Sequence, residues 1–193
     1  MIRVGLTGSI ATGKSTTAQM FRNEGVPVHD SDAAVHEVYR GEAVAPIGKL
    51  FSQVIDDNGV NRHRLREVLR KQPEMLSKLE AIVHPLVAAR REQAASKARQ
   101  DGEPLMVFDI PLLFETGIER DMDFTVVTFC EPEIQMGRLL KRKGMNAETA
   151  NMLIARQMPQ QEKRDRADFE IDTGLGFDAA QAAVKDIVRE LRA

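Results

Sequence analysis

The hydrophobic and polar positions of this chain follow two alternating periods, which predict a protein of the α/β class. Short apolar runs predict strands over residues 2–7, 26–29, 105–108, 124–129 and 169–171. Positions with the helical period predict helices over 14–23, 33–39, 132–142 and 147–157, and a terminal helix that Asp178 caps and that reaches Leu191. Because strands alternate with helices, we expect a parallel sheet covered by helices.

Residues 43–100 contain more helix than a single connection between two strands needs. Their pattern predicts helical segments over 45–51, 62–71, 73–84 and 86–100, with a turn at Asp57-Asn58-Gly59. We therefore expect a helical subdomain inserted between strands.

The composition is that of one globular domain. The chain has 193 residues, of which 42% are hydrophobic, which suffices for one core. Its formal charge of −2 gives no overall reason to expect nucleic acid or a membrane surface as a partner. The sequence has no leader pattern and no apolar run of the ~18 residues that span a bilayer, so we expect a cytoplasmic protein. The single cysteine, Cys130, is expected to serve packing.

The segment from Gly8 to Ser15 fits the phosphate-binding pattern G-x-x-x-x-G-K-S/T. It lies between a predicted strand and a predicted helix, which is where such a loop works. The glycines allow a tight turn whose N–H groups hold phosphate oxygens, together with the positive end of the helix dipole. We expect Lys14 to reach the β- and γ-phosphates and Ser15 to bind Mg²⁺. The predicted ATP-binding residues are Gly8, Ala11, Thr12, Gly13, Lys14, Ser15 and Thr16.

Three aspartates follow predicted strands, at the edge of the sheet where α/β proteins bind ligands. Asp30 and Asp32 follow the second strand, and Asp109 closes the strand over 105–108. One of the first two is expected to help hold Mg²⁺ and the other to take the proton of an acceptor hydroxyl, although Asp is also a preferred helix N-cap. Asp109 is expected to bind Mg²⁺ or its waters.

Basic residues cluster over 138–143 and around the Met158-Pro159 break. A kinase needs a mobile cationic cover, whereas most cations near a helix end are simply solvated. We single out Arg142, which precedes Gly144, as the candidate lid arginine. Ile110 follows Asp109 where a hydrolytic enzyme would have glutamate, and no N-K-x-D segment occurs, so a motor ATPase and a GTPase are both disfavoured.

Over nearly its whole length the chain resembles the dephospho-coenzyme A kinase family. The resemblance rests on a set of short segments: Leu6-Thr7-Gly8, Gly13-Lys14-Ser15-Thr16, Gly25-Val26-Pro27-Val28, Asp30-Ser31-Asp32, residues 62–69, His84-Pro85-Leu86, residues 109–115, Arg138 with Arg142, Gln157-Met158-Pro159, Glu162-Lys163, Ala167-Asp168 and Ile171-Asp172. The D-I-P-L-L-F-E and H-P-L runs distinguish this family from other small kinases.

The resemblance implies a P-loop kinase fold, which is a three-layer α/β/α structure with a helical acceptor-binding insertion and a lid. It places the core at about 1–42, 101–137 and 168–193, the insertion at about 43–100 and the lid at about 138–167. The implied reaction transfers the γ-phosphate of ATP to the ribose 3′-hydroxyl of dephospho-coenzyme A, with Mg²⁺. The resemblance implies that Asp32 is the base, that Arg142 is the lid arginine, and that the acceptor residues are Asp32, His84, Leu112, Leu113, Phe114 and Glu115. With the residues expected from the loop motif and the strand ends, the candidate catalytic residues are Asp32, Lys14 and Arg142, and the candidate metal residues are Ser15, Asp30 and Asp109.

Several interpretations stay open from the sequence. His84 also fits a core or capping histidine, and Leu112 to Phe114 also fit plain core. Ser9, Ala11 and Thr12 replace smaller residues that are usual in this family's loop, which puts nucleotide affinity in question. The alternative functions are another P-loop nucleoside or nucleotide kinase and a non-catalytic ATP-binding regulator. The protein is expected to be a monomer or a small homo-oligomer.

Overall fold

A computed structural model describes all residues, Met1–Ala193, and the chain divides into two compact units. Unit 1 comprises residues 1–29 and 98–193, and unit 2 comprises residues 30–97. The structure has no helix long and apolar enough to cross a membrane.

Unit 1 is built on a five-stranded sheet with the strand order β2-β5-β1-β6-β7. The pairs of β1 with β5, β1 with β6, and β6 with β7 are parallel, and Leu6 lies opposite both Asp109 and Val126. The predicted parallel α/β sheet is thus confirmed. The strands are β1 (Ile2–Gly8), β2 (Val28–Asp30), β5 (Leu105–Asp109), β6 (Phe124–Phe129) and β7 (Phe169–Asp172).

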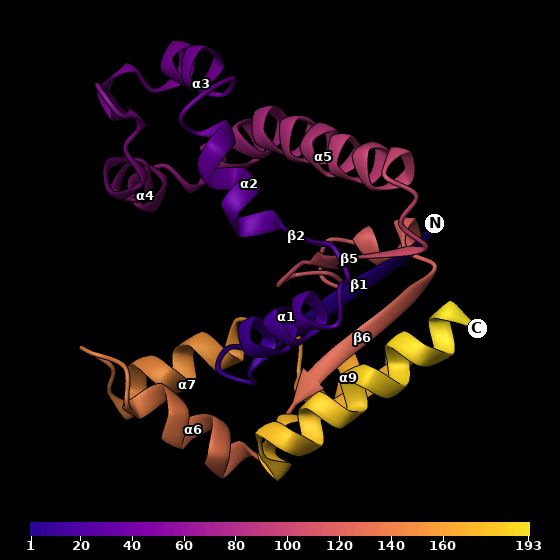
Figure 1. Cartoon of the computed structure of the whole chain (residues 1–193). Coiled ribbons are helices and arrows are strands. Elements are labelled where there is room, and N and C mark those ends of the chain that lie inside the picture. The colour runs from indigo at the N-terminus through magenta and orange to yellow at the C-terminus, as the bar shows by residue number, and fades with distance from the viewer. The chain divides into compact units, whose positions relative to one another are not determined.

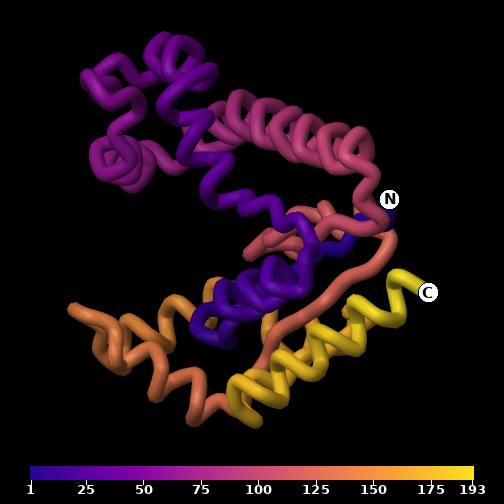
Figure 2. The backbone as a smooth tube through the Cα atoms, viewed as in Figure 1, coloured from indigo at the N-terminus to yellow at the C-terminus, as the bar shows by residue number.

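Helices α1 (Lys14–Asn23) and α9 (Phe177–Arg192) pack against each other and against one face of the sheet. Figure 1 shows both helices running alongside β1 and β6, and in Figure 2 the indigo start and the yellow end of the chain lie in this same unit. The inward side chains alternate along each strand, as the period of two requires. This core contains Val4, Leu6, Phe21, Leu105, Val107, Val126, Ile171, Val184, Ile187 and Leu191.

Three helices lie in or directly before the predicted lid segment, residues 138–167: α6 (Pro132–Leu140), α7 (Ala147–Ala155) and α8 (Gln160–Arg166). Two short 3₁₀ turns complete the unit, η3 (Ile118–Asp121) and η4 (Thr173–Leu175).

Unit 2 is mainly helical and has a core of its own around Val38, Ile47, Phe51, Leu65 and Leu79. Its helices are α2 (Ser31–Val38), α3 (Val44–Leu50), η1 (Ser52–Val54), α4 (Arg62–Lys71), η2 (Pro73–Met75) and α5 (Leu76–Gln100). A small hairpin of β3 (Ile55–Asp56) and β4 (Gly59–Val60) encloses the predicted turn.

The structure corrects four local predictions. Pro85 lies inside the continuous helix α5, where two helical segments were predicted. Helix α8 and the β3–β4 hairpin were not predicted, because both are too short to show a clear period. Asp178 does not cap α9, because the N-cap residue is Gly176. Asp178 lies in the first turn, where its negative charge interacts favourably with the positive end of the helix dipole.

Candidate functional site

The phosphate loop joins the end of β1 to the start of α1. Gly13 is the N-cap residue of α1 and has a φ of 93°, in the left-handed region that glycine tolerates. The first hydrogen bond of the helix runs from the Thr17 N–H to the Gly13 carbonyl. The N–H groups of Gly13 to Thr16 therefore have no acceptor within the helix, which is the arrangement that binds phosphate.

Hydrogen bonds from threonine hydroxyl groups hold this loop in place. Thr12 donates to the Ser9 carbonyl at 2.8 Å, and its Oγ1 lies 2.9 Å from that of Thr128 on β6. The Thr173 hydroxyl donates to the Thr12 carbonyl at 2.7 Å. A Cβ on Gly8 would lie 2.1 Å from Thr128 Oγ1, so only glycine fits there. Thr12 is thus a buried brace of the loop.

Lys14 and Asp109 form an ion pair that links α1 to the end of β5. Asp109 is buried, so the pair lies in a region of reduced dielectric where charges interact strongly. The structure thus brings the predicted phosphate lysine together with one of the predicted metal residues. Ser15 is exposed at the start of α1.

Arg138 contacts the loop although sequence reasoning treated it as a solvated cation. Its guanidinium donates to the Thr173 hydroxyl at 2.9 Å, to the Thr173 carbonyl at 2.7 Å and to the Ala11 carbonyl at 3.4 Å. Its contact with Thr173 spans 35 residues of sequence, so no local pattern indicates it. The family pattern, which pairs Arg138 with Arg142, was the only available signal.

A pocket of about 280 Å³ opens beside the start of α1. Within it, the buried hydroxyl of Thr17 has no hydrogen-bond partner in the protein. Phe177 is 60% exposed at its rim. The lining residues are Gly13, Thr16, Thr17, Met20, Arg138, Thr173, Gly176, Phe177 and Ala180. An orphaned buried hydroxyl and an exposed aromatic ring in one pocket suit a ligand that has both a polar edge and a flat face.

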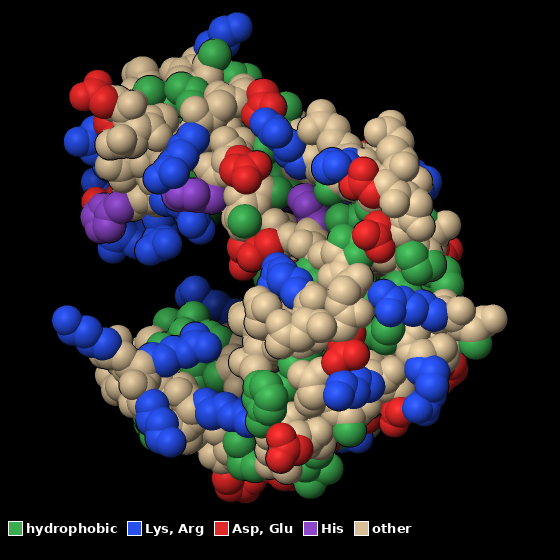
Figure 3. Space-filling model, viewed as in Figure 1, with side chains coloured by type: hydrophobic (Ala, Val, Ile, Leu, Met, Phe, Trp, Pro, Cys, Tyr) green, Lys and Arg blue, Asp and Glu red, His purple; other side chains and the backbone are tan.

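Arg142 follows the end of α6 and is exposed without an ion-pair partner. Two residues later, Gly144 has a φ of 76°, which marks a sharp change of chain direction. Lys and Arg side chains gather over α6 and α7 in Figure 3. This charge and the glycine are the features predicted for a cationic lid, and the role of Arg142 stays a prediction.

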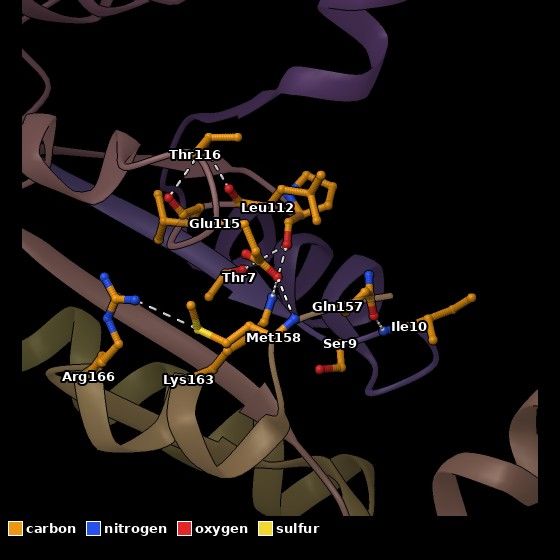
Figure 4. A network of polar contacts seen from close by, with 12 residues as sticks. Thr7, Ser9, Ile10, Leu112, Glu115, Thr116, Gln157, Met158, Lys163 and Arg166 are labelled. Atoms are coloured by element: carbon orange, nitrogen blue, oxygen red, sulfur yellow. Dashed lines mark hydrogen bonds and ion pairs between the residues drawn. The ribbon is translucent and has the colours of Figure 1, made fainter. Parts of the chain in front are cut away.

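The residues of the D-I-P-L-L-F-E run have different environments. Leu113 and Phe114 are buried in the core, as the alternative interpretation held, whereas Leu112 is 42% exposed. The Glu115 carboxylate forms an ion pair with Lys163 at 2.8 Å and accepts the Met158 N–H at 3.1 Å (Figure 4). Of these predicted acceptor residues, Leu112 therefore offers the most free apolar surface.

Asp30, Asp32 and His84 belong to unit 2. The Asp30 carboxylate accepts the Ala33 N–H at 3.0 Å and is the N-cap of α2, so the capping role predicted for one of the two acids falls on Asp30. Asp32 lies in the first turn of α2, exposed and without a hydrogen bond. His84 is exposed in the middle of α5 and is therefore neither a core nor a capping histidine.

Helix α4 gives unit 2 a strongly basic surface that sequence reasoning did not use. Asn61 caps the helix, and Leu65 fixes its inner face. Lys, Arg and His side chains gather around this helix in Figure 3. Its cations Arg62, Arg64, Arg66, Arg70 and Lys71 are free of ion pairs.

Burial raises the pKa of the Tyr39 phenol, and the nearby Arg62 cation opposes that shift.

Cys130 is buried and free, which confirms its packing role. Burial raises the pKa of its thiol, so the sulfur stays protonated and unreactive at neutral pH.

The fold and the loop define a P-loop kinase. A family model described as dephospho-CoA kinase matches residues 2–176. The chain is 52% identical to a dephospho-CoA kinase of Agrobacterium fabrum and 49% identical to one of Rhizobium meliloti, in each case over the full length of both chains. This chain therefore belongs to the dephospho-CoA kinase family, and it is a kinase that catalyses the last step of coenzyme A biosynthesis.

Solved structures share the fold of this chain. A Thermus thermophilus protein superposes with a TM-score of 0.84 at 33% identity, covering 98% of this chain and 97% of its own. A dephospho-CoA kinase from Campylobacter jejuni gives a TM-score of 0.77 at 22% identity, covering 98% and 96%. A shikimate kinase from Acinetobacter baumannii, at a TM-score of 0.52 and 15% identity, shares the fold. Family membership favours the first of the three functions expected from the sequence.

Proposed function

We propose that the loop Gly8–Ser15 holds the phosphates of ATP and that Lys14, Asp32 and Arg142 carry the transfer to the ribose 3′-hydroxyl of dephospho-coenzyme A. The observation that supports this most is the braced loop with unbonded N–H groups at the start of α1, beside the Lys14 and Asp109 charges. Phosphoryl transfer depends mainly on positioning and charge stabilisation, and this loop offers both.

The nucleoside of ATP would occupy the pocket beside α1. Two hydrogen bonds to Thr173 fix the guanidinium group of Arg138 at its edge, and a fixed guanidinium plane is a stacking surface for an aromatic base. Phe177 offers a second flat surface, and the orphaned Thr17 hydroxyl offers a polar contact. The pocket shares Gly13 and Thr16 with the loop, so a nucleoside there would direct its phosphates to the start of the helix.

The residues at the loop fit a magnesium ion. Mg²⁺ is usually held by one or two protein oxygens, with phosphates and waters completing its shell. The Ser15 hydroxyl has no partner in the protein, and the Asp109 carboxylate lies beside Lys14 at the loop. Ser15 and Asp109 would therefore hold the ion. When bound, Mg²⁺ neutralises phosphate charge. The structure contains no cluster of three or more metal-binding side chains, which suits an ion held mainly by substrate and water. Asp30 remains a predicted metal residue whose carboxylate is used in capping.

Asp32 is the proposed base. Its carboxylate is exposed and free of hydrogen bonds, so it can accept the proton of the acceptor hydroxyl. It also lies in the first turn of α2. Arg142 would neutralise charge on the transferring phosphoryl group.

Both units carry residues that are proposed to bind the acceptor. Dephospho-coenzyme A carries a diphosphate, and the unpaired cations of α4 provide the strongest positive charge of unit 2. His84 adds an exposed imidazole, and Leu112 adds an apolar contact. Glu115 would act through Lys163 and the Met158 backbone to position the lid segment.

The decisive experiment follows the acceptor by mass spectrometry. The full-length protein is incubated with ATP, Mg²⁺ and dephospho-coenzyme A, and the product should gain one phosphate on the ribose 3′-oxygen while ADP forms. Lys14→Met should lower kcat/KM by about 10²-fold or more, because the positive charge that stabilises the transferring phosphoryl group is lost. The exposed Lys185→Met on α9 is the matched control and should leave it unchanged. ADP formation at an equal rate without acceptor, or a preference for a nucleoside acceptor, would refute the proposal.

A further inference from the structure

The backbone N–H and carbonyl groups of Ile10, in the phosphate loop, are both held by glutamine side chains. Its N–H donates to Oε1 of Gln157 at 2.7 Å, and its carbonyl accepts from Nε2 of Gln135 at 2.8 Å. These glutamines lie 147 and 125 residues away in the sequence. Figure 4 shows the Gln157 side chain reaching Ile10 from the segment that precedes Met158.

The two glutamine amides differ in how much of their hydrogen-bonding capacity the protein uses. Gln135 is only 2% exposed, and both ends of its amide are bonded, because its Oε1 accepts from Gln160 at 3.0 Å. Gln160 in turn accepts the Cys130 N–H at 3.2 Å. Gln157 uses only its oxygen, and its Nε2 group has no partner in the protein.

Hydrogen-bond chemistry fixes the orientation of the Gln157 amide. The Ile10 N–H is a donor, so the atom facing it must be the oxygen, and the NH₂ group must point away from it. The backbone next to Gln157 is also anchored: its own N–H donates to the Ile154 carbonyl at 3.1 Å, and the Met158 N–H donates to Glu115 at 3.1 Å. Lys163, fully buried, holds Glu115 in place at 2.8 Å. The two N–H donors of Gln157 are therefore presented beside the phosphate loop at little entropic cost.

The place of Ile10 in the loop indicates which phosphate those donors meet. The nucleoside pocket is lined by Gly13 and Thr16, at the helix end of the loop, and Ile10 is not part of its wall. A triphosphate that starts in the pocket and passes Lys14 would have its terminal phosphate on the Ile10 side.

We propose that Nε2 of Gln157 donates a hydrogen bond to the terminal phosphate of the bound nucleotide, so that Gln157 is a binding residue that favours ATP over ADP. This inference rests on the proposed function, since it requires the loop to hold ATP. Because Gln157 follows α7, the same contact ties the lid segment to the presence of the γ-phosphate. A donor to a charged oxygen contributes more than one between neutral groups.

Gln157→Glu is the sharpest test, because it keeps an oxygen for the Ile10 N–H and replaces the NH₂ donor by a negative charge. We expect the Kd for ATP, measured by calorimetry with Mg²⁺, to rise by about 10-fold to 100-fold, and the Kd for ADP to change by less than about 3-fold. Gln161→Glu, an exposed position on α8, is the control with the same charge change, and both Kd values should stay unchanged.

Gln157→Met serves as a second variant that adds no charge, and thermal melts show that each variant is folded. We expect it to weaken ATP binding less than Gln157→Glu does, and again to spare ADP. Equal losses for ATP and ADP in these variants would show that Gln157 only supports the loop, and unchanged ATP affinity would show that it contacts nothing; either result overturns the inference. If the wild-type protein bound no ATP, the proposed function itself would fail. If the wild-type protein transferred phosphate but Gln157→Glu still bound ATP and ADP with the wild-type ratio of Kd values, this inference alone would be refuted.

Discussion

The hydroxyl oxygens of Thr12 and Thr128 lie 2.9 Å apart in the interior and join the phosphate loop to β6. Thr12 also bonds the Ser9 carbonyl across the loop. These same two hydroxyls close the Gly8 position to a side chain, because a Cβ there would lie 2.1 Å from Thr128 Oγ1 and 2.7 Å from Thr12 Oγ1. Thr12, one of the three unusual loop residues, therefore stabilises the loop from behind, and its side chain does not compete with the phosphates.

Replacing Thr128 by valine keeps the shape of the side chain and removes the hydroxyl. Thr12 then loses a buried hydrogen bond, and we expect the free energy of unfolding to fall by about 1–2 kcal/mol. Urea denaturation measures this loss. Thr128→Ser keeps the hydroxyl and should retain most of the stability that Thr128→Val loses, so equal losses in the two variants would show that the methyl group, rather than the hydroxyl, matters.

Ala11 is the only residue other than glycine with a positive φ, at 64°. An L-residue with a Cβ is disfavoured in this region by about 1 kcal/mol, and glycine is not. Ala11→Gly should therefore raise the free energy of unfolding by up to about 1 kcal/mol, less the greater entropy that glycine gives the unfolded chain. Ala89→Gly, on α5, is a control of the opposite sign, because glycine destabilises a helix interior. Destabilisation by Ala11→Gly would mean that the alanine side chain makes contacts that outweigh its backbone strain.

Helix caps and apolar periodicity, which act between residues close in the sequence, predicted the helices that they determine. The bounds of α1 and α4 are as predicted, because a glycine or asparagine cap precedes each helix and a regular apolar pattern follows. The continuous helix through Pro85 was missed, because proline usually ends a helix.

The contacts around the loop that the sequence did not indicate join distant positions. Thr173 reaches Thr12 across 161 residues, and Gln157 reaches Ile10 across 147. Neither residue type is rare, and neither position belongs to a phosphate-binding pattern. The motif identified the loop itself, but only the folded chain shows which side chains orient it.

Asp30 and Asp32 are two residues apart and should respond differently to substitution. Asp30→Ala removes the N-cap of α2 and should cost about 1 kcal/mol of stability. Asp32→Asn removes a proposed proton acceptor and should lower kcat by about 10²-fold to 10⁴-fold with little change in stability or in ATP affinity. Urea denaturation and steady-state kinetics on both variants separate the two roles. A small loss of kcat in Asp32→Asn would leave the transfer without its proposed base.

The β3–β4 hairpin should make stability depend on acid pH. The Asn61 amide at 2.9 Å and the Asn58 N–H at 2.9 Å both donate to Asp56 and lower the pKa of its carboxyl below the ordinary value. Since the folded-state pKa is the lower one, this contribution is fully present above the unfolded pKa of about 4 and is lost as the pH falls through the folded value. Asp56→Asn should flatten that part of the melting-temperature profile, whereas Asp57→Asn, exposed beside it, should not. Parallel profiles for Asp56→Asn and the wild type would contradict this assignment.

Lys163 and Glu115 should show unequal costs when either partner is removed. Lys163 is fully buried and meets only Glu115 at 2.8 Å and the Pro111 carbonyl at 3.4 Å, so Glu115→Gln strands a buried ammonium and should cost about 3–5 kcal/mol. Lys163→Met leaves a carboxylate whose side chain is 21% exposed and still accepts the Met158 N–H, so its cost should be smaller. Urea denaturation of both single variants and of the double variant measures the coupling. If Lys163→Met were the more costly change, the apolar stem of Lys163 would be the source of the stability, because the charge pair alone predicts the opposite order.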